Sequence, residues 1–293
     1  MIIVIVLGVL LAAAVLAGAV GIALFPPLPR DLGGARNLDP EARRVPIPHA
    51  DDEPLEGWWI PGTIPVTLLV LHGYGRTHHR AWRYAAFLRD AGYGIVTFDF
   101  RSSRTNGRRL PTTLGHHELP DAQAVLDWMR AAPELHGHRL GLFGESLGGS
   151  VGLVLAAANP DICCVVVDGG FAHSASAIED SSAGWARLPR QPTANLARAV
   201  GRAFTGVDPG SLDVETAALL LRDRPVLFIH AGRDNRISEG QARRLTAAAG
   251  PGAALWIIPE AGHNEGWLVR REEYEKRVLE FLERGFVPAA APV

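Results

Sequence analysis

The sequence predicts an α/β protein with a mostly parallel central sheet that is covered by helices on both faces. From residue 67 to residue 284, short apolar runs alternate with segments that carry apolar residues at helical spacing. The runs are apolar throughout, which is typical of strands buried on both faces. An uncharged stretch, residues 1–25, precedes this pattern, and a segment with several serines and prolines interrupts it at 171–223.

The composition fits one large core, or an anchor and one domain. The chain has 293 residues, of which 47% are hydrophobic. Its formal net charge of −2 creates no field that attracts nucleic acid, so no nucleic-acid partner is expected. The only cysteines, Cys163 and Cys164, are adjacent in an apolar run. Neighbouring residues of a strand point to opposite faces, which excludes a disulfide framework.

Residues 1–25 are predicted to form a transmembrane anchor. At about 1.5 Å per residue, this uncharged stretch is long enough to cross a bilayer. A buried helix and a cleaved signal peptide are the alternatives, but a signal peptide would carry Lys or Arg before the apolar stretch. The arginines Arg30, Arg36, Arg43 and Arg44 follow the span. By the positive-inside rule, the chain is expected to be a single-pass membrane protein whose remaining part, the folded domain, lies on the cytoplasmic face.

The rest of the chain is expected to be a linker and one folded domain. Residues 26–45 contain PPLP and DLGGARNLDP, and are predicted to be a linker. The domain is predicted over residues 46–293.

The first half of the domain supplies two strands and two helices. TLLVLH (67–72) is a short apolar run that Gly73 ends, so it is predicted to be a strand. HHRAWRYAAFLRDAG (78–92) has apolar residues near helical spacing and stops at its last glycine. GIVTFDF (94–100) is predicted to be the next strand, and ELPDAQAVLDWMRAA (118–132) a helix with one apolar face.

The second half continues the alternation around an insertion. LGLF (140–143) is predicted to be a strand, and LGGSVGLVLAAAN (147–159), apolar nearly all round, a buried helix. The remaining elements are strands at 163–168, 226–231 and 254–259, and helices near 239–249 and at 271–284. Sites in such sheets lie beyond the carboxyl ends of the strands. The insertion 171–223, with a helical piece at 194–204, is therefore expected to form a cap over a site.

A serine lies between a predicted strand and the buried helix. Residues 144–148 read Gly-Glu-Ser-Leu-Gly, which fits the pattern Gly-x-Ser-x-Gly. A strand-to-helix turn this sharp strains the serine backbone, and glycines on both sides remove the clashes that larger residues would make. Ser146 is therefore predicted to be a nucleophile, whereas the alternative is a glycine-rich turn with a serine that has no role.

A serine hydroxyl needs a base, and two later loops supply candidates. His263 follows the strand 254–259 and Asp234 follows the strand 226–231, so both are expected at the same edge of the sheet as Ser146. Their order, Ser, Asp and then His, is the one found when this chemistry is built on such a fold. Asp168, at the end of the strand 163–168, is the alternative acid.

Two backbone amides are expected to stabilise the oxyanion of a tetrahedral intermediate. One is the amide of Leu147, which follows the nucleophile. The other is the amide of Tyr74, in the loop His72-Gly73-Tyr74-Gly75 after the strand 67–72. The alternative for this loop is a glycine turn without a role.

Over about residues 55–284 the chain resembles the α/β-hydrolase family, in the branch of serine hydrolases with an amino-terminal membrane anchor. The matching motifs are His72–Gly75, FDFR (98–101), the Gly-x-x-Glu-x-x-Asp spacing within 114–129, Gly144–Gly149, Gly232–Asp234 and Gly262–His263. The chain departs from the family after FDFR, where relatives usually have glycines and this sequence has Ser102-Ser103-Arg104-Thr105-Asn106. The resemblance implies hydrolysis of esters, thioesters or amides, with no metal and no organic cofactor.

These features predict a membrane-anchored serine hydrolase that acts on a small-molecule or lipid-like acyl substrate. A serine peptidase on the same fold is one alternative, and an aminopeptidase would need acidic cap residues such as Glu179 and Asp180. A membrane-anchored binding protein without catalysis is the other alternative. It would lack or misplace one of Ser146, Asp234 and His263.

Overall fold

The computed structural model describes residues 21–28, 39–50, 53–104, 108–184, 187 and 189–287. The predicted anchor lies outside these residues except for 21–25, and so does half of the predicted linker, residues 29–38. Within the described ranges, no helix is both long and apolar enough to cross a membrane.

The described residues form an eight-stranded sheet in the order β1-β2-β4-β3-β5-β6-β7-β8. Its strands are β1 (Arg43–Ile47), β2 (Leu55–Ile60), β3 (Val66–Leu71), β4 (Gly94–Phe98), β5 (Arg139–Glu145), β6 (Ile162–Asp168), β7 (Val226–Ala231) and β8 (Ala253–Ile258). β1 pairs antiparallel with β2, and β2 pairs antiparallel with β4, whereas the five remaining neighbouring pairs are parallel. The sheet is therefore mostly parallel, as the apolar runs predict.

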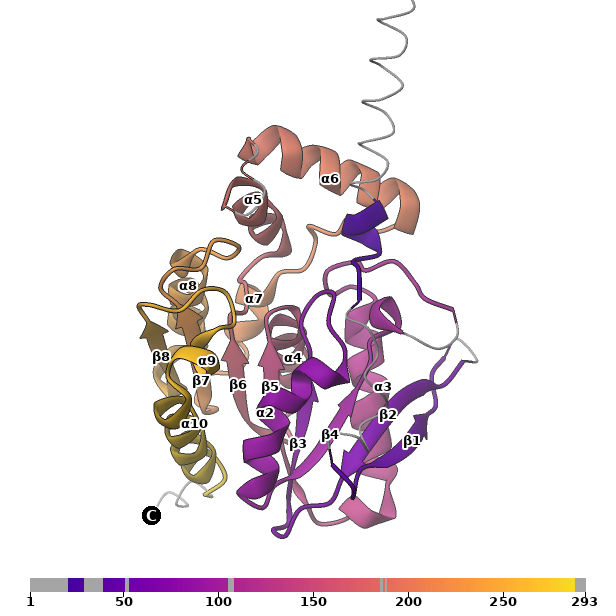
Figure 1. Cartoon of the computed structure of the whole chain (residues 1–293), viewed down its shortest axis with the longest axis vertical. Coiled ribbons are helices and arrows are strands. Elements are labelled where there is room, and N and C mark those ends of the chain that lie inside the picture. The colour runs from indigo at the N-terminus through magenta and orange to yellow at the C-terminus, as the bar shows by residue number, and fades with distance from the viewer. Residues whose placement is uncertain are drawn as a thin grey trace, which may run out of the picture.

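Helices cover both faces of this sheet (Figure 1). They are α2 (His78–Asp90), α3 (Glu118–Ala131), α4 (Leu147–Ala158), α5 (Ser174–Gly184), α6 (Arg190–Thr205), α7 (Val214–Ala218), α8 (Glu239–Ala249), α9 (Gly266–Val269) and α10 (Arg271–Gly285), with short 3₁₀ turns at Arg101–Ser103, Pro133–Leu135 and Gly250–Gly252. α2 and α10 share one apolar core with the sheet, while α3, α4 and α8 share the other.

The register of the parallel strands brings their carboxyl ends to one level. Glu145 of β5 pairs with Asp168 of β6, and Asp168 in turn pairs with Ile229 of β7. Ala231, the last residue of β7, pairs with Ile258 at the end of β8. The loops after these strands therefore leave the sheet along one edge, and they carry the predicted site.

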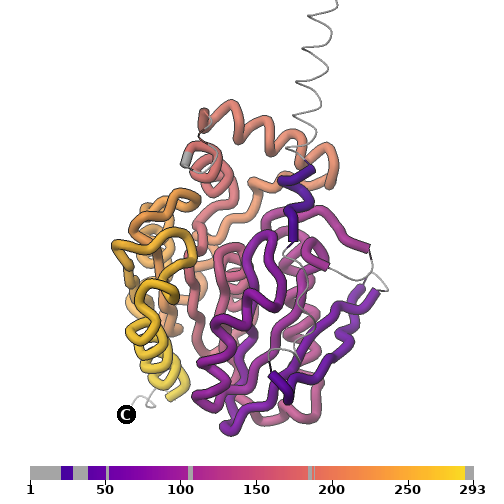
Figure 2. The backbone as a smooth tube through the Cα atoms, viewed as in Figure 1, coloured from indigo at the N-terminus to yellow at the C-terminus, as the bar shows by residue number. Residues whose placement is uncertain are grey.

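The amino-terminal part of the domain differs from the prediction. β1 begins at Arg43, inside the range expected to be linker, so the sheet starts before residue 46. The tube in Figure 2 shows this segment running along the sheet edge. Its sequence, RRVPI, combines two charges with a proline, a composition that edge strands tolerate and that hides a strand from an apolar pattern.

Residues 21–28 contact the domain. The hydroxyl of Tyr74 donates to the carbonyl of Ala23 at 2.8 Å, and the amide of Thr112 donates to the carbonyl of Leu24 at 2.9 Å. The guanidinium of Arg109 donates to the carbonyl of Pro26 and lies over the ring of Phe25. The junction between the predicted anchor and linker is thus held against the Tyr74 loop.

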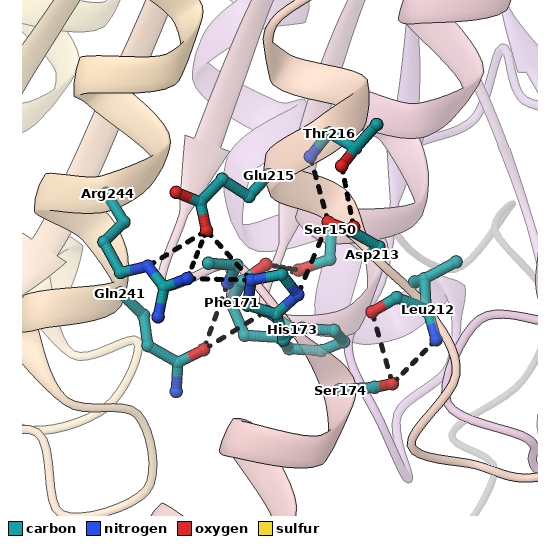
Figure 3. Close-up of polar contacts among 11 residues, drawn as sticks. Ser150, Phe171, His173, Ser174, Leu212, Asp213, Glu215, Thr216, Gln241 and Arg244 are labelled. Atoms are coloured by element: carbon teal, nitrogen blue, oxygen red, sulfur yellow. Dashed lines mark hydrogen bonds and ion pairs between the residues drawn. The ribbon is translucent and has the colours of Figure 1, made fainter.

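The cap insertion leaves and re-enters the domain through two segments that are tied together (Figure 3). His173 and Asp213 form an isolated antiparallel bridge, and Ser174 and Leu212 exchange hydrogen bonds. A second set of contacts joins these two segments to α8. Glu215 accepts from Arg244 of α8 and lies 2.9 Å from Nε2 of His173. The base of the cap is therefore fixed to the sheet domain. α5, α6 and α7 lie within the insertion.

Candidate active site

Ser146 occupies the sharp turn between β5 and α4. Its φ of 52° and ψ of −118° are backbone angles that residues other than glycine rarely adopt. A Cβ at Gly144 would lie 2.5 Å from the carbonyl oxygen of Gly148, and one at Gly148 would lie 2.6 Å from the carbonyl oxygen of His72. These distances are too short for any side chain, so the glycines of the motif are required for the turn to close.

Three side chains from three loops form a hydrogen-bonded row. Oγ of Ser146 lies 3.0 Å from Nε2 of His263, and Nδ1 of His263 lies 2.6 Å from Oδ2 of Asp234. His263 follows β8 and Asp234 follows β7, which are neighbours in the sheet. The side chain of Asp234 is 1% exposed and that of His263 is 13% exposed, so the row is sheltered but reachable from solvent.

The environment of Asp234 favours its ionised form. Burial opposes ionisation, but the hydrogen bond from His263 and those from the amides of Ile237 and Arg236 outweigh it, so the pKa of Asp234 is lowered. A carboxylate in this position holds the imidazole in one orientation and stabilises the imidazolium.

Asp168, the alternative acid, belongs to another network. Its carboxylate accepts from the hydroxyl of Tyr274 at 2.8 Å and from that of Tyr84 at 3.3 Å. Burial raises its pKa to about 6. Its main-chain carbonyl accepts from the amide of Ser146 at 2.7 Å and from the side chain of Asn264 at 2.9 Å. Asp168 therefore supports the turns that carry Ser146 and His263 without contacting the imidazole through its carboxylate.

The loop after β3 lies against the serine. A Cβ on Gly73 would lie 3.2 Å from Cβ of Ser146, so the two backbones touch. Among the described residues, neither the amide of Tyr74 nor that of Leu147 donates to a protein acceptor. Both predicted oxyanion donors thus remain available beside Ser146.

His72 fixes the orientation of this loop. Its Nδ1 lies 2.9 Å from the carbonyl oxygen of Gly73, and its Nε2 accepts from the amide of Phe100 at 3.2 Å. Burial lowers the pKa of His72, which keeps the ring neutral with the proton on Nδ1. Because a trans peptide points its C=O and N–H in opposite directions, anchoring the Gly73 carbonyl turns the Tyr74 amide the other way.

A pocket of about 450 Å³ opens at the serine. Its described lining is polar and comes from the loops after β3, β5, β7 and β8 together with α2 and α9: Gly73, Tyr74, Arg76, Arg80, Glu145, Ser146, Arg233, Asn235, Arg236, Gly262, His263, Asn264, Glu265 and Leu268. None of these residues comes from the cap insertion at 171–223.

Two residues beside Ser146 gave no clear signal in the sequence. Glu145 is buried, and its Oε1 accepts from Nε of Arg80 at 3.0 Å. Arg80 also donates to the carbonyl of Asn264, so it links the serine turn to the histidine loop. Glu145 and Arg80 are 65 residues apart, which is why no local pattern could pair them.

The family motifs outside the pocket stabilise the domain. Arg101 of FDFR donates to Asp121 at 2.6 Å, and Glu118 accepts from the hydroxyl of Thr112 and the amide of Gly115. Within the described part of the chain, no cluster of three or more His, Cys, Asp or Glu side chains could hold a metal ion.

Comparison with known proteins assigns the chain to a family. A sequence model of the prolyl oligopeptidase family matches residues 78–287. The chain belongs to this family. Its relatives include the uncharacterized protein YqkD of Bacillus subtilis, 26% identical over 246 residues that span 81% of this chain and 78% of the relative. Another is the uncharacterized protein YfhR of Escherichia coli, 22% identical over 82% of this chain and 80% of the relative.

Solved structures of hydrolases share the fold. The Pyrococcus furiosus esterase Pf2001 superposes with a TM-score of 0.74 and 26% identity, over 89% of this chain and 98% of that chain. The Pyrococcus horikoshii acylaminoacyl peptidase superposes at 0.64 over 90% of this chain and 46% of that one, and at 18% identity it shows likeness of fold alone. The chain is a serine hydrolase of the α/β-hydrolase fold.

Proposed function

We propose that the chain is a membrane-anchored esterase that cleaves an ester, thioester or related acyl bond through a covalent acyl-enzyme. The observation that carries the proposal is the row in which Ser146 Oγ lies 3.0 Å from His263 Nε2 and His263 Nδ1 lies 2.6 Å from Asp234. This arrangement gives the hydroxyl a base and gives the base an orienting carboxylate.

In the proposed reaction, His263 takes the proton of Ser146 as the hydroxyl oxygen attacks the acyl carbonyl. The amides of Tyr74 and Leu147 donate to the oxyanion, and Asp234 stabilises the imidazolium. His263 then gives its proton to the leaving group as the carbon–oxygen or carbon–sulfur bond breaks. Water, deprotonated by His263, attacks the acyl-enzyme and releases the acid and free Ser146.

An esterase fits these observations better than an aminopeptidase. Holding a substrate amine would need free carboxylates, and Glu179 and Asp180 of the cap are the sequence candidates. Glu179 instead accepts from Gln191 within the cap, and Asp180 accepts from Ser238 and Gln241 of the sheet domain. Neither residue lines the pocket. The likeness to the esterase Pf2001 over nearly its whole length supports the same choice.

The membrane part of the proposal rests on the uncharged residues 1–25, with the domain on the cytoplasmic face because of the arginines that follow. Fractionation of cells that express the full chain should place it with membranes. A carboxyl-terminal reporter active only outside the cytoplasm should stay silent, and activity of that reporter would overturn the orientation.

A substrate panel tests the catalytic proposal. Purified full-length chain should hydrolyse short 4-nitrophenyl esters or acyl thioesters faster than aminoacyl anilides, and Ser146→Ala should remove this activity. Faster cleavage of the anilides would favour the peptidase instead. Equal rates for wild type and Ser146→Ala would contradict the assignment of the nucleophile.

A further inference from the structure

The pocket at Ser146 carries an excess of positive charge. Four arginines and two glutamates line its described part, and Leu268 is its one aliphatic residue there. The arginines are Arg76, Arg80, Arg233 and Arg236. A lining of this kind offers little apolar surface to a long alkyl chain.

The two glutamates compensate only half of the charge of the four arginines. Glu145 is committed to Arg80, through the contact at 3.0 Å. The carboxylate of Glu265 accepts from the amide of Gly262, so it is hydrogen-bonded within its own loop. Among the described residues, the guanidiniums of Arg76 and Arg233 have no carboxylate partner within ion-pair distance.

Arg76 and Arg233 line the pocket from two of the loops that build the site. Arg76 lies between the Tyr74 loop and the start of α2, and Arg233 immediately precedes Asp234. Burial lowers the pKa of Arg76, and the guanidiniums of Arg80 and Arg236 lower it further against the opposing charge of Glu145. Like charges gathered around a nucleophile destabilise one another until an anion joins them.

We propose that this pocket selects acyl substrates that carry an anionic group, a carboxylate or a phosphate, which Arg76 and Arg233 bind beside the scissile bond. The inference rests on the proposed esterase function and narrows its substrate class. Guanidiniums suit both groups because their planar N–H donors match two oxygens at once. A carboxylate or phosphate would pair with the two guanidiniums, which no carboxylate of the described pocket approaches within ion-pair distance.

Matched pairs of esters test this selection and find where the charge belongs. Mono-4-nitrophenyl adipate and 4-nitrophenyl hexanoate differ by a carboxylate on the acyl side. 4-Acetoxybenzoate and its methyl ester differ by a carboxylate on the leaving group, and 4-acetoxyphenyl phosphate compared with 4-acetoxyanisole tests a phosphate at that place. In at least one pair, kcat/KM should be about tenfold or more higher for the anionic member, the effect of one charge-assisted contact. Raising ionic strength from about 0.05 M to about 0.5 M should reduce this preference.

Variants connect the preference to the two arginines. Arg76→Gln and Arg233→Gln should each reduce the preference about tenfold while kcat/KM for the neutral ester changes less than about threefold. Arg76→Glu should reverse the preference. Arg243→Gln is the matched control, because Arg243 is an exposed arginine on α8 that pairs with Glu239.

Each outcome has one meaning. The inference would be overturned by equal rates within every pair, by faster cleavage of cationic esters, or by a preference that survives both Gln variants. The esterase proposal would still stand after any of these results. If folded wild-type protein cleaves none of the esters, and a fluorophosphonate does not label Ser146, the proposed function is overturned as well.

Discussion

Nδ1 of His263 lies 2.6 Å from Oδ2 of Asp234, whereas the carboxylate of Asp168 accepts from Tyr274 and Tyr84. The two acids reach the same edge of the sheet from neighbouring strands, yet only one of them orients the imidazole. We therefore expect Asp234 to take part in catalysis and Asp168 to support the fold.

Replacing each acid with asparagine should show the difference in activity. Asp234→Asn should lower kcat by about 10⁴, because the amide favours the wrong tautomer of His263. Asp168→Asn should cost much less, since it leaves the contact between His263 and Asp234 in place. Esterase assays of the two variants, with circular dichroism to show that both fold, measure this. A larger loss from Asp168→Asn would assign the orienting role to Asp168.

The pH dependence of stability should report on Asp168. Burial raises its pKa from the ordinary 3.8 to about 6, so the folded protein holds this proton more tightly than the unfolded chain. The folded state therefore loses stability as the pH rises from about 4 through about 6, by on the order of 3 kcal/mol in full. Asp168→Asn removes this loss. The difference between the Tm of the variant and the Tm of wild type should therefore be more favourable to the variant at about pH 7.5 than at about pH 4.

The control for that measurement is Asp90→Asn, an exposed carboxyl at the end of α2. Its Tm relative to wild type should be nearly the same at both pH values. If Asp168→Asn behaves like Asp90→Asn, Asp168 does not bind its proton more tightly in the folded state.

Gly148 should tolerate no side chain. A Cβ there would lie 2.6 Å from the backbone carbonyl oxygens of Leu71 and His72, which have no room to move. Gly148→Ala should lower the free energy of unfolding by about 1–3 kcal/mol and reduce activity, because the nucleophile turn must shift. Gly240→Ala on α8 meets nothing within 4 Å and should be neutral or stabilising by up to about 1 kcal/mol. Chemical denaturation of both variants compares them, and equal stabilities would contradict the close packing of the turn.

The side chain of Tyr74 should matter less than its amide. The hydroxyl donates to the carbonyl of Ala23, so its hydrogen bond holds the amino-terminal segment. Tyr74→Phe should keep kcat within about threefold, whereas removing an oxyanion donor costs about 10²–10³. Steady-state kinetics decide between these values, and a loss of 10² or more in Tyr74→Phe would mean that the hydroxyl itself takes part in the reaction.

Much of the sheet could be predicted from the sequence, because buried parallel strands are apolar throughout. The strands β3 to β8 and the helices α2, α3, α4, α8 and α10 appear close to their predicted ranges. β1 was hidden by its charges and proline, and α5, whose sequence is SASAIEDSSAG, by its serines. Both depend on packing against the rest of the chain more than on local pattern.

The residues of the candidate site also differ in whether the sequence could predict them. Ser146, Asp234 and His263 each carry a local signal, a short motif directly after a strand, and the parallel topology brings such positions together. Arg80 and Glu145, or His72 and the Gly73 carbonyl, act through contacts that a single sequence does not encode in any pattern. The charge of the pocket could not be predicted either, since its arginines come from loops after different strands.

Labelling by a fluorophosphonate tests the central claim most directly, since this reagent reacts with a serine only when a neighbouring base and oxyanion donors activate it. Folded full-length protein should be labelled at Ser146, as peptide mass spectrometry would locate it, and His263→Ala should abolish the labelling. A folded wild-type chain that stays unlabelled, or that is labelled at a different serine, would contradict the account.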